Sequence, residues 1–208
     1  MEFVFGASIL KKVPLDSSSE LALIERCQRQ DMEAFGQLID AYQNRVFGFA
    51  RRLVGDADEA ADIAQEVFVK AFQAFSRFDG RSSVRTWLFR IAHNLCIDRL
   101  RKLERAPLET RIDARVEGET TFEIMDSRWD PEASAIDSEL AAAVEVAVGS
   151  LSEKLRSVLL LHDKEDMAYD EIASALNLPV GTVKSRLFLA RAHLQQALAP
   201  YLRGEVTS

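Results

Sequence analysis

The chain has 208 residues, of which 26 are basic and 33 acidic, so its formal net charge at pH 7 is −7. With 48% hydrophobic and 28% charged residues, it has a globular composition, which excludes a fibrous or disordered protein. Two cysteines, Cys27 and Cys96, are too few for a disulfide framework or a multi-cysteine metal site, and no apolar run approaches the ~20 residues of a membrane span. We therefore expect a reduced, cytoplasmic protein of one or two domains.

Helices are predicted from residue 19 onward, after an extension over 1–18 that shows no regular pattern. Apolar residues recur at helical spacing over 31–53, and the pattern stops at Gly55. Glycine is common at such a position because it adopts the left-handed conformation found just past a last turn. Asp56, with Glu59 three residues later, is typical of the start of another helix.

The helix predicted over 56–78 has two different faces. One is an apolar stripe wide enough to join a helical core. The stripe consists of Ala60, Ile63, Ala64, Val67, Phe68, Ala71, Phe72 and Phe75. Asp62 and Glu66 are four residues apart and share a separate face. Taken alone, this acidic pair indicates a solvated surface, and the alternative is a docking surface for a basic partner helix.

A basic segment follows, because residues 81–105 carry seven basic and two acidic side chains. The sequence from Phe78 to Ser83 is typical of a turn, with Ser82 or Ser83 as the cap of the next helix. That helix has an inner stripe of Trp87, Leu88, Ile91, Ala92 and Leu95, whereas Arg85, Arg90, Asn94, Arg101 and Lys102 lie outside it. Arginines neutralise phosphates and aromatic rings stack on unpaired bases, which favours a nucleic-acid surface. A lone tryptophan in such a stripe is more often a core residue.

The middle of the chain is acidic, with three basic and eleven acidic residues over 106–150. From residue 106 to about 134 there is no sustained helical or alternating period, and Pro107 and Pro131 bracket this stretch. We expect a flexible acidic linker between two compact parts. No strand pattern occurs anywhere, so the predicted fold class is all-α, with two small helical domains.

The last third predicts a helix-turn-helix. Helices are expected over 151–162, 168–176 and from Val180 to about Ala199, with a turn at Asn177-Leu178-Pro179. The last helix has an inner set of Val183, Leu187, Ala190, Leu194 and Leu198. Its first turns carry the polar side chains Thr182, Lys184, Ser185 and Arg186. A plain helical hairpin does not explain this cluster, whereas a recognition helix entering a major groove does.

Three blocks of sequence, in this order, resemble the extracytoplasmic-function (ECF) group of bacterial sigma-70-family factors. They are DEAADIAQEVFVKAF (58–72), FDGRSSVRTWLFRIAHNLCIDRLRK (78–102) and YDEIASALNLPVGTVKSRLFLARAHL (169–194). The resemblance implies a sigma region 2 domain over 19–105 and a sigma region 4 domain over 136–205, joined by the linker over 106–135. The extension over 1–18 lies outside the resemblance.

The resemblance also implies which residues carry the function. Those that would dock on the clamp helices of the largest subunit of core RNA polymerase are Asp62, Gln65 and Glu66. Those that would melt and recognise the promoter −10 element are Phe78, Arg81, Ser82, Trp87, Arg90 and Asn94. Those that would recognise the −35 element are Thr182, Lys184, Ser185 and Arg186, in a domain that binds the flap of the second largest subunit. Many relatives carry a basic residue where Leu189 stands, so the −35 sequence is open.

The resemblance further implies promoter DNA and an anti-sigma factor as partners, the latter often membrane-anchored, and neither cofactor nor metal. We expect the free protein to bind promoter duplex poorly, since both domains need the polymerase to hold them at the right spacing. The alternative is a stand-alone helix-turn-helix regulator, which would leave residues 56–102 unexplained. An enzyme is the weakest hypothesis, because His93, His162 and His193 lie far apart in sequence and no nucleophile motif accompanies them.

Overall fold

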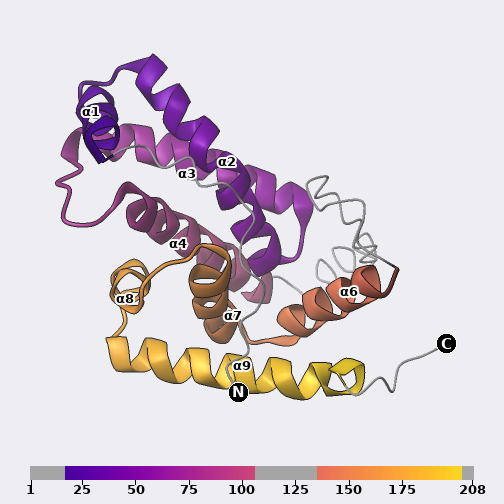
Figure 1. Cartoon of the computed structure of the whole chain (residues 1–208). Helices are drawn as coiled ribbons and strands as arrows, with labels where there is room; N and C mark the ends of the chain where they lie inside the picture. The colour runs from indigo at the N-terminus through magenta and orange to yellow at the C-terminus, as the bar shows by residue number, and fades with distance from the viewer. Residues whose placement is uncertain (1–16, 106–134, 203–208) are drawn as a thin grey trace.

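The computed structural model describes residues 17–105 and 135–202, and within these ranges it contains helices and no strand (Figure 1). The first half comprises α1 (Ser17–Gln28), α2 (Met32–Val54), α3 (Ala57–Ala74), a 3-10 turn η1 (Phe75–Arg77) and α4 (Val84–Arg105). The second comprises α6 (Ala135–Ser150), α7 (Glu153–Leu159), a π-helical turn η2 (Leu160–Lys164), α8 (Tyr169–Leu176) and α9 (Val180–Leu202). The all-α class is confirmed. Residues 1–16 of the predicted extension and 106–134 of the predicted linker lie outside the described residues, and residues 17–18 belong to α1.

The helix boundaries in the first half follow local signals in the sequence. The Asp31 carboxylate accepts hydrogen bonds from the backbone N–H of Glu33 and Ala34, at 3.0 and 3.1 Å, and so caps α2. Gly55 ends α2 with a φ of 88°, and the Asp56 carboxylate caps α3 by accepting from Glu59 N–H at 2.8 Å. These boundaries confirm the sequence predictions, except that α3 ends at Ala74 and continues as the tighter η1 turn rather than as α-helix to residue 78.

Aromatic rings fill the core between α2, α3 and α4. Phe75 lies at their centre, with ring centroids 6.0 Å from Phe35, 5.5 Å from Phe78 and 5.3 Å from Trp87. The predicted α3 stripe is buried, apart from a half-buried Phe72. Because Phe75 is 1% exposed and touches both Phe78 and Trp87, the core directly supports the segment that follows α3.

The predicted inner stripe of α4 packs against the core but is incomplete. Phe89 and Cys96 are fully buried, although neither was placed in the stripe, and Phe89 packs edge-to-face on Phe49 with centroids 5.4 Å apart. Trp87 and Leu95 are only half-buried. Since α4 contacts α2 and α3 on one side and α8 on another, its buried surface is wider than a single stripe.

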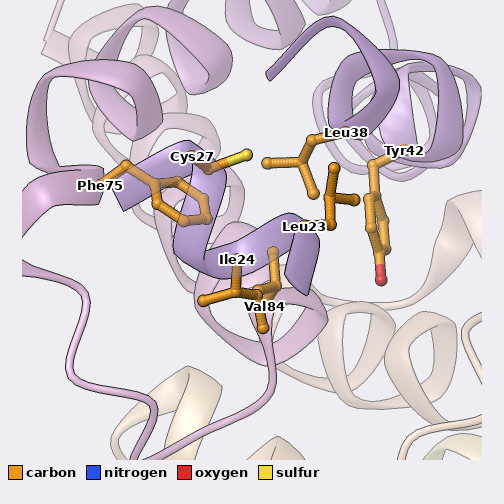
Figure 2. Close-up of a pocket in the computed structure, with 7 residues that line it drawn as sticks. All are labelled: Leu23, Ile24, Cys27, Leu38, Tyr42, Phe75 and Val84. Carbon is orange, nitrogen blue, oxygen red and sulfur yellow. The ribbon is translucent and has the colours of Figure 1, made fainter. Parts of the chain in front are cut away.

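The packing of α1 against the core leaves only a small cavity (Figure 2). Its volume is about 10 Å³, and it is lined by Leu23, Ile24, Cys27, Leu38, Tyr42, Phe75 and Val84. Such a volume holds at most about one water, so the cavity is no ligand site. Burial raises the pKa of the Cys27 thiol, and it raises that of Cys96 to about 12. Both thiols are therefore core side chains of low reactivity.

The second half contains the predicted helix-turn-helix. Asn177 ends α8 in the left-handed conformation with a φ of 52°, and Leu178 N–H donates to the carbonyl of Ala173 at 2.9 Å. All five residues of the predicted inner set of α9 are buried. The helix predicted over 151–162 instead begins at Glu153 and becomes a π-helical turn at Leu160, and the sequence analysis gave no separate prediction for α6.

The two halves pack against each other. α8 packs against α4 and α7 against α2, and in Figure 1 α9 runs beneath α7 and α8. Buried apolar side chains from both halves form one continuous cluster. The sequence predicts two compact parts on a flexible tether and gives no sign of this contact. None of the described helices is long and apolar enough to cross a membrane.

Candidate nucleic-acid and polymerase interface

One candidate surface is the outer face of α3. Asp62, Gln65 and Glu66 are exposed there, on the side opposite the buried stripe. Glu66 forms an ion pair with Lys70 at 3.3 Å, whereas Asp62 has no ion-pair partner in the part of the chain that the structure describes. Val69, half exposed, adds an apolar side chain to the same helix. A rigid helix with two carboxylates and an amide around an apolar contact suits a partner helix that carries basic side chains.

A second candidate surface is an open pocket of about 400 Å³ beside the start of α4. It is lined by Arg77, Phe78, Asp79, Arg81, Ser82, Trp87, Arg90 and, from the second half of the chain, Ser174. Five of the six residues predicted for −10 recognition are thus brought together, and the sixth, Asn94, is exposed further along α4. An indole edge, guanidinium groups and a hydroxyl around one hollow are suited to an unpaired base and its phosphate.

The pocket residues play different structural parts. Phe78 is 6% exposed, its ring lies tilted against that of Trp87 with centroids 5.2 Å apart, and its carbonyl accepts a hydrogen bond from the Gln28 amide at 2.8 Å. It therefore fixes the pocket wall from behind. Asp79 accepts from the backbone N–H of Arg81 at 3.1 Å and pairs with its guanidinium at 3.0 Å. The sequence analysis did not select Asp79 or Arg77 as site residues, and only their position in the basic turn before α4 could have indicated them.

His93 lies on α4. Its pKa is lowered to about 4, mainly by burial and further by the charges of Arg186 and Arg101, while a hydrogen bond with Asn94 opposes them. His93 is therefore neutral at pH 7. Arg186, a residue predicted to recognise DNA, thus acts on a side chain of the first half of the chain. Among the described residues, no three His, Cys, Asp or Glu side chains group together to hold a metal.

The depressed pKa of His93 makes folding sensitive to acid. The unfolded chain, in which this pKa is 6.5, binds the proton between pH 6.5 and about 4, and the folded chain does not. Stability therefore falls as the pH drops through this window, by about 3 kcal/mol at its lower end. We expect the His93 ring to titrate near pH 4 by NMR. Urea unfolding at pH 7 and pH 4.5 measures how much stability each protein loses in acid, and we expect His93→Gln to lose less than the wild type. An equal loss of stability in both proteins would contradict this assignment.

A third candidate surface is the start of α9. Lys184 and Ser185 are exposed, and Thr182 and Arg186 are half-buried, so the predicted polar cluster lies at one end of the helix. The Ser185 hydroxyl donates to the carbonyl of Thr182 at 3.1 Å, and the Lys184 ammonium lies 5.6 Å from the Tyr169 ring centroid.

Two apolar side chains extend this surface. Phe188 is 73% exposed and Leu189 is 54% exposed. The sequence analysis did not select Phe188, although its position just outside the inner set of α9 could have indicated it. Apolar side chains on a recognition helix contact thymine methyl groups, so these two residues are candidates for the same DNA contact as the polar ones.

Comparison with known families matches both halves of the chain. Residues 38–106 match the family model for Sigma-70 region 2, and residues 141–194 match that for Sigma-70, region 4. The first match contains α3 with its acidic face and all residues of the pocket beside α4 except Ser174. The second contains α8, the turn and α9 as far as Leu194.

Individual relatives match over nearly the whole chain. The RNA polymerase sigma-H factor of Pseudomonas aeruginosa is 38% identical over 91% of this chain and 98% of its own length. The ECF RNA polymerase sigma-E factor of Escherichia coli is 36% identical over 89% of this chain and 97% of its own length. Among solved structures, the sigma factor RpoE of Bartonella quintana, in complex with the anti-sigma factor NepR, shares the fold. Its TM-score is 0.61 and its identity 24%, over 79% of this chain and 96% of that one.

Proposed function

Because this chain belongs to the ECF group of the sigma-70 family, we propose that α3 docks it on core RNA polymerase while the α4 pocket and α9 recognise the promoter. As a sigma factor, it directs transcription initiation and is not an enzyme. The observation that supports the proposal most is that five of the six residues predicted for −10 recognition line one open pocket. The following assignments go residue by residue.

Docking on the polymerase is assigned to Asp62, Gln65 and Glu66. They are exposed on one face of a helix whose other face is buried, so a partner can bind them without disturbing the core. The partner surface is the clamp helices of the largest polymerase subunit. Binding there would place the neighbouring pocket over the promoter DNA.

Capture of an unpaired −10 base is assigned to the pocket. Trp87 supplies the stacking surface, and Arg81 and Arg90 supply charge for the adjacent phosphates. Ser82 supplies a hydroxyl for the base edge, Phe78 holds Trp87 in place, and Asn94 extends the surface along α4. A stacked base is worth roughly 1–3 kcal/mol, which helps to offset the cost of unpairing it.

Recognition of the −35 element is assigned to Thr182, Lys184, Ser185 and Arg186. They occupy the first turns of α9. The left-handed Asn177 ends α8, so the chain changes direction before α9 begins. Recognition helices contact base edges with their N-terminal residues, and this position fits that mode. Leu189 lies one turn later, where it offers apolar contact instead of the charge that many relatives have.

Control by an anti-sigma factor and a cytoplasmic location complete the proposal. Family membership supports both, and the Bartonella relative is bound to an anti-sigma factor in its solved structure. A membrane-anchored anti-sigma factor would hold the chain near the membrane. The stand-alone regulator is no longer a competing hypothesis, since the relatives match about nine-tenths of the chain, including the segment that a simple regulator leaves unexplained.

Reconstituted transcription tests this function. Core bacterial RNA polymerase is combined with the protein and a library of promoter fragments, and initiation is measured with and without it. We expect initiation that depends on the protein, from fragments that share −35 and −10 sequences. The protein without polymerase should bind the same duplex fragments weakly. Polymerase binding without initiation from any fragment would indicate a missing factor, and absence of polymerase binding would refute the docking assignment.

Trp87→Ala tests the pocket. On duplex promoters, initiation should fall about tenfold, because the stacking surface for the unpaired base is lost. On templates whose −10 region is already unpaired by mismatches, most of the loss should be recovered, since the cost of melting has been removed. An equal loss on both templates would show that Trp87 acts through folding alone.

A further inference from the structure

The −10 pocket is in contact with the other DNA-binding domain. Glu171 lies in the first turn of α8, and both of its carboxylate oxygens accept hydrogen bonds from Arg85 Nη2, at 2.9 and 2.7 Å. Thr86 Oγ1 donates to the same carboxylate at 3.2 Å, and Ser83 Oγ at 3.3 Å. Three side chains at the start of α4, next to the pocket, thus bind one carboxylate of region 4.

A pocket arginine is also occupied. Arg90 Nη2 donates to the carbonyl of Ser174 at 2.7 Å and to its hydroxyl at 2.8 Å, and Ser174 itself forms part of the pocket wall. Arg90 is one of the two cations assigned to the −10 phosphates. Arg90 Nη2 cannot donate to Ser174 and to a DNA phosphate at the same time. Binding of α8 and binding of the non-template strand therefore compete for this nitrogen.

The contact extends well beyond the pocket. Arg45 on α2 pairs with Glu165 at 2.6 Å, and Glu165 is only 6% exposed. Arg85 also donates to the carbonyl of Glu165 at 3.1 Å. At the far end of the contact, Arg156 on α7 donates to the carbonyls of Arg52 and Leu53, at 3.0 and 3.3 Å. Both carbonyls lie in the last turn of α2, where backbone oxygens have no partner within the helix. These contacts, with the continuous apolar cluster, describe a built interface.

This arrangement cannot recognise both promoter elements together. The −35 and −10 elements are about 25 base pairs apart, which is about 85 Å of straight duplex. In the structure, by contrast, α8 touches the −10 pocket, and the charge of Arg186 acts on His93 of α4. The two DNA-recognising surfaces must therefore separate before promoter binding.

We propose that region 4 binds region 2 as an internal ligand in a closed state of the chain: Glu171 and Ser174 hold Arg85 and Arg90, occupy one side of the −10 pocket, and must be released for promoter recognition. This inference rests on the proposed function of the pocket and of α9. Asp62, Gln65 and Glu66 stay exposed in this closed state. Core polymerase can therefore bind the closed chain first and then separate region 4 from the pocket by binding both domains. The closed contact also explains why the free protein would bind DNA weakly.

Fluorescence energy transfer in the full chain tests the closed state. Dyes are placed at Gln73→Cys on α3 and Gln196→Cys on α9, two exposed positions, while the native thiols Cys27 and Cys96 are buried. Glu171→Lys replaces the attraction to Arg85 with repulsion and should lower the transfer efficiency. The charge swap Arg85→Glu/Glu171→Lys should restore it. Asp170→Lys is the matched control: it makes the same change one residue away, where the carboxylate is exposed and has no ion pair among the described residues, and it should leave the efficiency unchanged.

A binding measurement relates closure to the pocket. The probe is a single-stranded oligonucleotide with the −10 non-template sequence of a promoter found by reconstituted transcription. Glu171→Lys should bind the oligonucleotide about tenfold more tightly than the wild type, because region 4 is released from the pocket in a larger fraction of the molecules. Asp170→Lys should bind it with the affinity of the wild type. Equal transfer efficiency in Glu171→Lys and the wild type, or opening without a gain in affinity, would overturn the proposal. Failure of the wild type to support polymerase-dependent initiation would instead refute the proposed function, whatever the fluorescence shows.

Discussion

Initiation will fall at least about 100-fold when Asp62 and Glu66 are both changed to lysine. The loss follows from placing two positive charges where a basic polymerase helix is to bind, since losing one partner of an interfacial charge pair costs roughly 2–5 kcal/mol and reversal costs more. Both side chains are exposed and Asp62 has no ion-pair partner among the described residues, so folding should be preserved. Polymerase binding is measured directly, by titrating labelled protein with core enzyme, alongside transcription.

The matched control for this charge reversal is Asp40→Lys. Asp40 is an exposed carboxylate on α2, outside the docking surface assigned to α3. Its reversal should change polymerase affinity only slightly, whereas the single variant Asp62→Lys should already weaken binding about tenfold or more. If both single variants had the same small effect, the acidic face of α3 would be a solvated surface, as the sequence pattern alone suggests.

Phe75→Ala will lower the stability of the protein by about 3–5 kcal/mol, the usual cost of removing a fully buried phenylalanine ring. Phe75 is 1% exposed and its ring touches those of Phe35, Phe78 and Trp87. The midpoint of thermal unfolding should fall by about 10 °C. The cavity left by the missing ring would also make Phe78 and Trp87 more mobile. At temperatures below unfolding, initiation should therefore fall more on duplex promoters than on templates already unpaired at −10.

Phe188→Ala provides the comparison for stability. It removes the same ring from α9, where the side chain is 73% exposed, and should change the unfolding midpoint by no more than about 2 °C. Its effect on DNA recognition is a separate matter, because Phe188 lies beside the residues proposed to recognise the −35 element. A similar loss of stability in the two variants would show that Phe75 is less important to the core than its burial and ring contacts indicate.

Local patterns predicted the helices. Helix periodicity, the Asp56 cap, the Gly55 stop and the Asn177 turn depend on residues within a few positions of one another, and all four are confirmed. The predicted α4 stripe was incomplete because α4 is covered on more than one side, and a periodic pattern assumes one buried face.

The sequence by itself determined the all-α class, the helix-turn-helix and the residues of the acidic and polar faces, because hydrophobic spacing and caps act within one or two turns. Only the tertiary structure decided that Phe78 supports the pocket from behind, that Arg77 and Asp79 line it, and that Glu171 binds Arg85 from 86 positions away. The physical reason is that many carboxylates could pair with a given arginine. Which one does so depends on how the apolar surfaces of both halves pack, and that packing is a property of the whole chain.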